Sequence, residues 1–339
     1  MRLSCRLGVV FCLAALLPTL VFAATTKRAA PTRPESDGTA NYKGAIVLDA
    51  ATGNVVFEDR ADYVGPPASV AKLMTFLVVH DRLQRGDLSL QTPVLTTAEA
   101  AKTGGSQVYL AEKEVFPVEE LLYALMIASA NDAATALAIH VAGSRAAFVE
   151  AMNARARELG MAQTTFRSPH GLPPSSRQLS DSDVTSPRDL AKLSLHLLRH
   201  TDILKYTSVK TRTFRPGPKQ IDMVNHNHLL GKVAGVDGLK TGFTRGAGFC
   251  LAATAYRNNR RVVVVTMGSP DSKSRDIKIA ELIEKGFSAL PVAAPFQAPS
   301  NSPIQPAPRV TPPPPPPAPA KAPAAAEGDA VIKFSIPKR

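Results

Sequence analysis

Strand-like segments at both ends of the globular part, with helical segments between them, constrain the fold most. The stretches 44–48 and 55–58 are short and rich in apolar and β-branched residues, and a turn joins them as a hairpin. A second such pair, 248–256 and 262–267, lies late in the chain. One antiparallel sheet assembled from both ends of the chain fits this order, with a helical region inserted between its strands. We therefore predict a mixed α/β (α+β) fold.

The middle of the chain carries apolar residues at helical spacing. The predicted helices are 69–85, 121–128, 133–141, 189–200 and 281–290. Ser186 and Pro187 suit the N-terminus of the fourth helix.

The first residues have the composition of a secretory signal peptide. Arg2 and Arg6 give a positive start, the stretch 7–22 is almost wholly apolar, and small residues mark a cleavage site after Ala23. No later segment has the roughly 18 unbroken apolar residues of a membrane-spanning helix. We therefore predict a signal peptide at 1–23 and an exported protein, periplasmic or otherwise in the cell envelope.

Composition divides the rest of the chain. Residues 24–41 are polar and read as a linker, and 42–292 form the predicted globular domain. Residues 293–339 are dominated by Pro and Ala, which predicts an extended, disordered tail. The alternating stretch 331–336 does not predict an amphipathic membrane-binding helix. The sequence leaves open whether the protein attaches to a membrane and what partner the tail has.

Charge and cysteine content exclude some classes of protein. The formal net charge is +12, but the basic residues are scattered, so we predict no nucleic-acid partner. In an exported protein, attraction to an anionic wall polymer or membrane surface explains this charge better. Of the three cysteines only Cys250 lies beyond the predicted signal peptide, so no internal disulfide is expected.

A serine and a lysine lie three residues apart at the start of the first predicted helix. Positions three apart share a helix face, so the Ser69 hydroxyl and the Lys72 amine can meet. Burial lowers the pKa of a lysine, and a neutral amine can take the proton of a serine nucleophile. Taken alone, the same spacing also fits a capping serine with a solvated lysine.

Two further polar motifs follow. Ser129 and Asn131 interrupt two apolar helical stretches, where a hydroxyl could relay a proton and an amide could orient a carbonyl group. Taken alone, this motif is explained better by an ordinary turn between two helices. Lys240, Thr241 and Gly242 lie on a predicted edge strand, where an ammonium group and a hydroxyl could bind a carboxylate and a glycine admits a close backbone.

The ordered trio Ser-x-x-Lys, Ser-x-Asn and Lys-Thr-Gly is far rarer than any of its parts. A nearly identical trio is the established signature of class A β-lactamases and penicillin-binding proteins. We assign the three motifs of this chain on the basis of that known signature. With its flanking residues and the stretch 168–172, the chain resembles the low-molecular-mass penicillin-binding proteins that act as serine D-Ala-D-Ala carboxypeptidases. The resemblance covers roughly 42–290 and implies a β-lactamase/transpeptidase-like fold, with a five-stranded antiparallel sheet flanked by helices.

The resemblance also implies roles for the motif residues. Ser69 would be acylated by the penultimate D-Ala carbonyl, with Lys72 as general base, and Ser129 with Lys240 would pass a proton to the leaving amine. The implied substrate-binding residues are Asn131, Lys240, Thr241, Gly242, Phe243 and Arg275. Among them, Asn131 would hold the peptide, and Lys240, Thr241 and Arg275 would receive its terminal carboxylate.

The main-chain N–H groups of Ser69 and Phe243 would form the oxyanion hole. The implied partners are a peptidoglycan stem peptide ending in D-Ala-D-Ala, and β-lactams as covalent inhibitors. Familiar members carry His where this chain has Phe243, and they carry a second β-rich domain and a C-terminal amphipathic helix where this chain has its Pro-rich stretch.

Three alternatives to the carboxypeptidase were weighed. A DD-endopeptidase that cuts crosslinks would use the same residues, and a penicillin-binding sensor or scaffold would keep the site without turnover. A class A β-lactamase would need a Glu-x-x-Leu-Asn type loop between the second and third motifs, which the chain lacks.

No cofactor and no metal are expected. His226 and His228 lack a partner at ligand spacing in the sequence. We expect His170 to shape the cleft and Asp189 to cap or pair within its helix.

Overall fold

The structure is a computed structural model, and it describes residues 41–176, 178–215 and 217–290. The predicted signal peptide, all but the last residue of the linker, and the Pro/Ala-rich tail lie outside the described residues. Within the described ranges, no helix is both long and apolar enough to span a bilayer.

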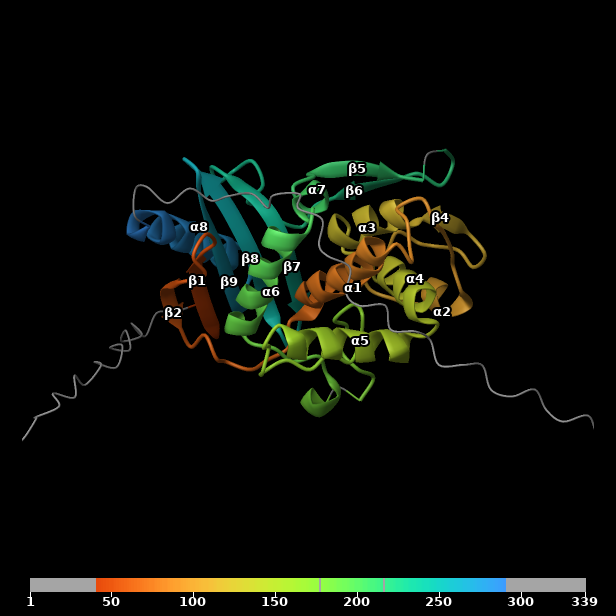
Figure 1. Cartoon of the computed structure of the whole chain (residues 1–339), viewed down its shortest axis with the longest axis horizontal. Helices are drawn as coiled ribbons and strands as arrows, with labels where there is room; N and C mark the ends of the chain where they lie inside the picture. The colour runs from red at the N-terminus through yellow and green to blue at the C-terminus, as the bar shows by residue number, and fades with distance from the viewer. Residues whose placement is uncertain (1–40, 177, 216, 291–339) are drawn as a thin grey trace, which may run out of the picture. The chain divides into compact units, whose positions relative to one another are not determined.

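Five antiparallel strands form the central sheet, in the order β2-β1-β9-β8-β7 (Figure 1). Their bounds are β1 Gly44–Asp49, β2 Val55–Asp59, β7 Val236–Thr244, β8 Gly248–Arg257 and β9 Arg260–Ser269. Strand β1 pairs with β9, with Gly44 opposite Met267. The sheet is therefore assembled from early and late segments, as the sequence predicts.

Both faces of the sheet are covered, which explains why β9 is apolar at consecutive positions. Val263 and Val265 face the large core shared with α6 (Pro187–His200) and the helical region. Val262 and Val264 face a second core, which they share with α8 (Ser272–Ala289). A strand that is buried on both sides loses the alternation of a half-exposed strand.

The inserted region lies between β2 and β7 and supplies most of the helices (Figure 1). Its elements are η1 Ala68–Ala71, α1 Lys72–Arg85, β3 Pro93–Leu95, α2 Ala98–Ala101, β4 Val115–Pro117, α3 Val118–Met126, α4 Asn131–Ala142, α5 Arg145–Glu158, η2 Leu179–Asp181, α7 Leu204–Thr207, β5 Thr211–Phe214 and β6 Ile221–Val224. Helix α1 is the centre of this region, because it packs against α3, α4, α5 and α6. Its residues from Lys72 to His80 are all buried.

The helices differ from their sequence-based prediction in two ways: α8 is longer than predicted, and α2, α5 and α7 were not predicted. Helix α8 begins at Ser272 rather than at 281, because Asp271 caps it by accepting a hydrogen bond from the Ser274 N–H at 2.8 Å. Helix α5 was not predicted. Ser144 caps it in the same way, but its charged residues are spread around the helix and leave only Phe148, Met152 and Ala156 buried.

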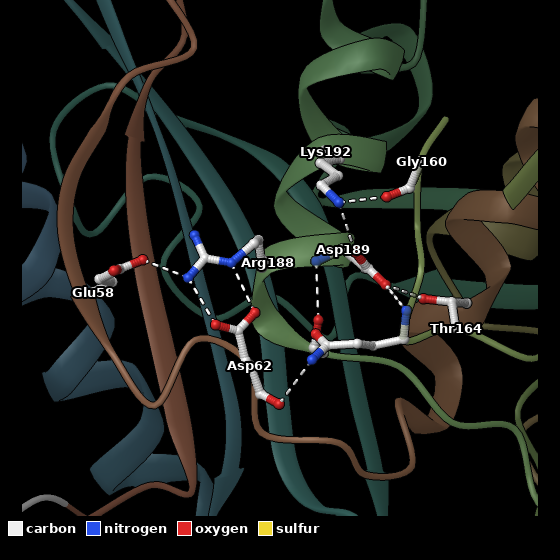
Figure 2. Close-up of polar contacts among 9 residues, drawn as sticks. Glu58, Asp62, Gly160, Thr164, Arg188, Asp189 and Lys192 are labelled. Atoms are coloured by element: carbon white, nitrogen blue, oxygen red, sulfur yellow. Dashed lines mark hydrogen bonds and ion pairs between the residues drawn. The ribbon is translucent and has the colours of Figure 1, made fainter. Parts of the chain in front are cut away.

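A polar network ties the start of α6 to neighbouring loops (Figure 2). The Arg188 guanidinium donates to both Asp62 carboxylate oxygens, at 2.8 and 2.9 Å. The buried Asp189 accepts from the Gln163 N–H and the Thr164 hydroxyl, and it pairs with Lys192. Asp189 therefore pairs at its helix start, as predicted, and anchors the loop that follows α5.

Candidate active site

Ser69 and Lys72 meet at the junction of η1 and α1. Ser69 lies in the 3₁₀ turn and Lys72 is the first residue of α1, so their side chains lie on the same face. The Lys72 amine nitrogen is 3.1 Å from the Ser69 hydroxyl oxygen. The Lys72 side chain is fully buried, and burial, followed by the nearby Lys240 charge, holds the pKa of Lys72 well below its usual range.

The contacts of Lys72 define the direction of its lone pair. Its nitrogen is 2.6 Å from the Asn131 amide oxygen and 2.8 Å from the His170 carbonyl oxygen. Both of these oxygens can only accept hydrogen bonds. A neutral amine has two N–H groups, so in that form both are used there and the lone pair faces the Ser69 hydroxyl.

The second motif supplies a hydroxyl and an amide. Ser129 lies between α3 and α4 with a φ of 57°, in the left-handed region. Its hydroxyl is buried and has no hydrogen-bond partner within the described part of the chain. Asn131 begins α4; its amide oxygen faces Lys72, and its NH₂ group donates to the Gly104 carbonyl at 2.8 Å. These contacts orient the Asn131 side chain.

The third motif lies on the edge strand β7. The Lys240 side chain is buried and donates to the Thr241 carbonyl at 3.2 Å. Burial and the Arg275 charge lower the pKa of Lys240 to about 7. Gly242 allows β7 to approach η1: an added Cβ would lie 2.6 Å from the Pro67 carbonyl oxygen and 3.0 Å from the Ser69 nitrogen. The strand's main chain therefore lies against the Ser69 N–H.

Arg275 and Phe243 complete the predicted set. Arg275 is buried in the first turn of α8, close enough to Lys240 to lower its pKa, and its guanidinium donates to Asp276 at 2.7 and 2.9 Å. Phe243 is half exposed, and its ring stacks on Phe249 at a centroid distance of 4.1 Å. The predicted residues thus come from η1, the start of α1, the connection between α3 and α4, the start of α4, β7 and the start of α8.

Some contacts of the site were not predicted. The His170 carbonyl holds Lys72, and the Thr75 hydroxyl donates to the Pro169 carbonyl at 2.5 Å. Gly171 has a φ of 81°, and an added Cβ would lie 1.9 Å from the Ala68 carbonyl oxygen. His170 itself is buried, which lowers its pKa to about 3. The Pro-His-Gly sequence marked this loop as unusual, but nothing in the sequence indicated that its main-chain carbonyl contacts Lys72.

Two buried carboxylates also lie near Lys72. Asp132 accepts from the N–H groups of Val108 and Leu110, and Asp183 accepts from those of Arg167 and Ser168. Both charges favour the protonated form of Lys72, against the larger effect of burial. A cavity of about 1020 Å³ borders this region, with Gly104, His170 and Asp183 in its wall.

The histidine pair lies at the edge of the site. His228 approaches the Asp276 carboxylate at 3.3 Å, and the Lys240, Lys72 and Arg275 charges add to burial in lowering the pKa of His226 to about 4. In the described ranges, no group of three or more His, Cys, Asp or Glu side chains could hold a metal ion. Cys250 is buried and free.

Comparisons with known proteins agree with this geometry. The chain is 34% identical to D-alanyl-D-alanine carboxypeptidase DacF of Bacillus subtilis over 247 residues, which cover 73% of this chain and 62% of DacF. It therefore spans about three fifths of that relative. It is 37% identical over 226 residues to a D-alanyl-D-alanine endopeptidase of Escherichia coli, covering 66% of this chain and 70% of that protein.

A solved structure shares the fold. Penicillin-binding protein D2 of Listeria monocytogenes, in its ampicillin-bound form, is 34% identical and superposes with a TM-score of 0.65. The match covers 73% of this chain and 97% of that one. This confirms the predicted β-lactamase/transpeptidase-like fold. The family model described as D-alanyl-D-alanine carboxypeptidase matches residues 28–271, and the chain belongs to that family.

Proposed function

We propose that this protein is a serine D-alanyl-D-alanine carboxypeptidase that removes the terminal D-Ala from peptidoglycan pentapeptides. The observation that carries the proposal is the position of the Lys72 amine, 3.1 Å from the Ser69 hydroxyl and 2.6 Å from the Asn131 amide oxygen. Family membership and the electrostatic proximity of Lys240 support it.

In the proposed acylation step, Ser69 attacks the carbonyl carbon of the penultimate D-Ala, and its proton passes to the neutral Lys72 amine. The main-chain N–H groups of Ser69 and Phe243 stabilise the oxyanion. The C–N bond then breaks, and the proton that Lys72 took from Ser69 passes through the Ser129 hydroxyl to the leaving amine, while Lys240 remains an ammonium group and assists this transfer by its charge. This route gives a partner to the Ser129 hydroxyl, which has none among the residues that the structure describes.

Recognition of the substrate rests on charge. The terminal carboxylate binds the Lys240 ammonium and the Thr241 hydroxyl, and Arg275 adds positive potential from α8. Asn131 donates from its NH₂ group to the peptide, and Gly242 leaves room for the peptide backbone beside β7. Water then hydrolyses the ester and frees Ser69.

β-Lactams follow the same route in this proposal. The solved Listeria relative is described with ampicillin and with cefotaxime bound, and it shares 34% of its sequence with this chain. Penicillin acylates Ser69 and is released slowly, because the chain lacks a β-lactamase deacylating loop. The basic and apolar composition of residues 1–23 supports export to the periplasm or cell envelope.

A DD-endopeptidase that cuts crosslinks is the second candidate. It is favoured by the relative that is 37% identical and is named a D-alanyl-D-alanine endopeptidase. The same acylation chemistry serves both reactions, and only the group on the leaving amine differs.

The first prediction tests both activities with one variant. The mature protein is incubated with a D-Ala-D-Ala pentapeptide and with a crosslinked dimer, and products are identified by mass. Ser69→Ala is expected to lower D-Ala release by about 10⁴-fold or more, because no other group can form the acyl-enzyme. Ser288→Ala, an exposed serine of α8, is the matched control and keeps full activity.

Full activity in the Ser69→Ala variant would exclude this mechanism. Cleavage of the dimer alone would establish the endopeptidase instead. Acylation by penicillin without turnover of either peptide would favour a penicillin sensor.

A further inference from the structure

A buried carboxylate outside the three motifs fixes the loop that holds the catalytic lysine. Asp183 is 4% exposed. One of its oxygens accepts from the N–H groups of Arg167 and Ser168, at 2.6 and 2.9 Å, and the other accepts from the Ser168 hydroxyl at 2.7 Å. Three hydrogen bonds to one buried carboxylate leave the main chain at 167–168 little freedom.

Ser168 carries this constraint to the active site. Its hydroxyl oxygen also accepts from the Gly171 N–H at 2.8 Å, which closes a tight turn around His170. Gly171 packs against the main chain at Ala68, immediately before Ser69. The turn thereby fixes the His170 carbonyl, which lies 2.8 Å from the Lys72 nitrogen.

We propose that Asp183 is a positioning residue: through Ser168 and the turn at His170 it aims the lone pair of Lys72 at the Ser69 hydroxyl. Among the described residues, the His170 carbonyl and the Asn131 amide oxygen are the two acceptors that hold the N–H groups of neutral Lys72. A shift of this carbonyl therefore rotates the lone pair away from Ser69. In this proposal, Asp183 acts through these groups.

The charge of Asp183 contributes a second effect. Burial lowers the pKa of Lys72 most, and the Lys240 charge lowers it further. The charges of Asp183 and Asp132 raise it. His170 has its pKa lowered to about 3 and His226 to about 4, so both are neutral near pH 7 and add no charge there. Burial raises the pKa of the Asp183 carboxyl itself, so its charge acts on Lys72 at pH values above that pKa. In that range, removing the charge lowers the pKa of Lys72, and the neutral base persists to lower pH.

The second prediction separates position from charge. Asp183→Asn keeps an oxygen that can accept from both main-chain N–H groups but removes the charge. Ser168→Ala keeps the charge but removes the link to Gly171. The measurement is the rate of Ser69 acylation by penicillin, followed by mass spectrometry from pH 4 to 9, with circular dichroism to verify folding.

We expect opposite signatures from the two variants. Asp183→Asn shifts the acid limb of the acylation profile to lower pH. Ser168→Ala leaves the acid limb in place and lowers the plateau rate by about 10-fold, because small errors in the placement of a base are costly. Asp181→Asn is the matched control and changes neither; Asp181 is an exposed neighbour whose carboxylate accepts from the Ser176 and Ser180 hydroxyls.

Folded variants with the parent's acid limb and plateau would overturn this inference. The inference about Asp183 rests on the proposed function. The acylation assay distinguishes failure of the inference from failure of the proposed function. Acylation of the parent without D-Ala release refutes the carboxypeptidase assignment alone, whereas a parent that penicillin does not acylate refutes both.

Discussion

At the scale of single residues, two buried lysines do different work because their surroundings differ. Lys72 has its N–H groups directed at two acceptors and its pKa held well below the usual range, which suits a neutral base. Lys240 has one main-chain acceptor, and its pKa is lowered to about 7, so it is about half protonated at neutral pH. Each positive charge disfavours the other, which separates their protonation steps.

The third prediction follows from the Lys240 pKa. The kcat/KM for D-Ala release reports the free enzyme, so it should fall as pH rises through about 7, where Lys240 loses the charge that binds the carboxylate. Lys240→Arg keeps the charge at every working pH and should move this alkaline limb upward by more than one unit, even if its plateau is lower. The measurement is the pH profile of kcat/KM; an alkaline limb that stays near 7 in Lys240→Arg would assign it to another group.

At the scale of elements, the site depends on how closely β7 approaches η1. Ser69 and Lys72 belong to one turn, but Lys240 reaches them only because a strand from late in the chain lies against that turn. Gly242 is the point of closest approach, with no room for a Cβ between Pro67 and the Ser69 nitrogen.

The fourth prediction tests this approach. Gly242→Ala would place a Cβ 2.6 Å from the Pro67 carbonyl oxygen, so β7 must move outward. Acylation of Ser69 by penicillin should fall by about 100-fold, because a displacement of about 1 Å has that cost. Gly246→Ala, in the neighbouring turn, meets nothing within 4 Å and serves as control. Equal acylation rates in the two variants would show that the contact is not needed.

The same elements show what a sequence can predict. The apolar spacing of α1 and the three-residue separation of Ser69 and Lys72 are local, and both were predicted. The carbonyls of Gly104 and His170 were not, because every residue carries the same main-chain acceptor and only the fold selects two of them. Asp183 was missed for a related reason. It lies in a loop rich in Ser and Asp, and the sequence alone does not distinguish a buried carboxylate from an exposed one there.

At the scale of the whole described domain, the sheet was predictable because its strands are apolar at both ends of the chain. The length of α8 and the presence of α5 were missed. The capping residues Asp271 and Ser144 are visible in the sequence, but the buried faces of both helices depend on partners that are distant in sequence. The buried polar groups between α1, α5 and α6 also depend on such partners. Partly buried His196 lies beside them; it accepts from Arg155 at 3.1 Å, and its ring centroid is 4.5 Å from that of His200.

The fifth prediction concerns stability against acid. Burial, then the charges of His200, Arg155 and His80, lowers the pKa of His196 to about 4, against about 6.5 in an unfolded chain. The unfolded state therefore binds more protons between these values. The contribution of His196 to the free energy of unfolding is fully present above pH 6.5 and is lost as pH falls toward 4.

His196→Gln removes this titration while keeping an acceptor for Arg155, so its melting temperature should fall less between pH 7 and pH 4.5 than that of the parent. His140→Gln, on the exposed end of α4, serves as control and should follow the parent. Carboxylates titrate alike in all three proteins, so the difference between the melting curves isolates His196. Parallel curves for His196→Gln and the parent would mean that the cluster between α1, α5 and α6 accepts a proton without cost.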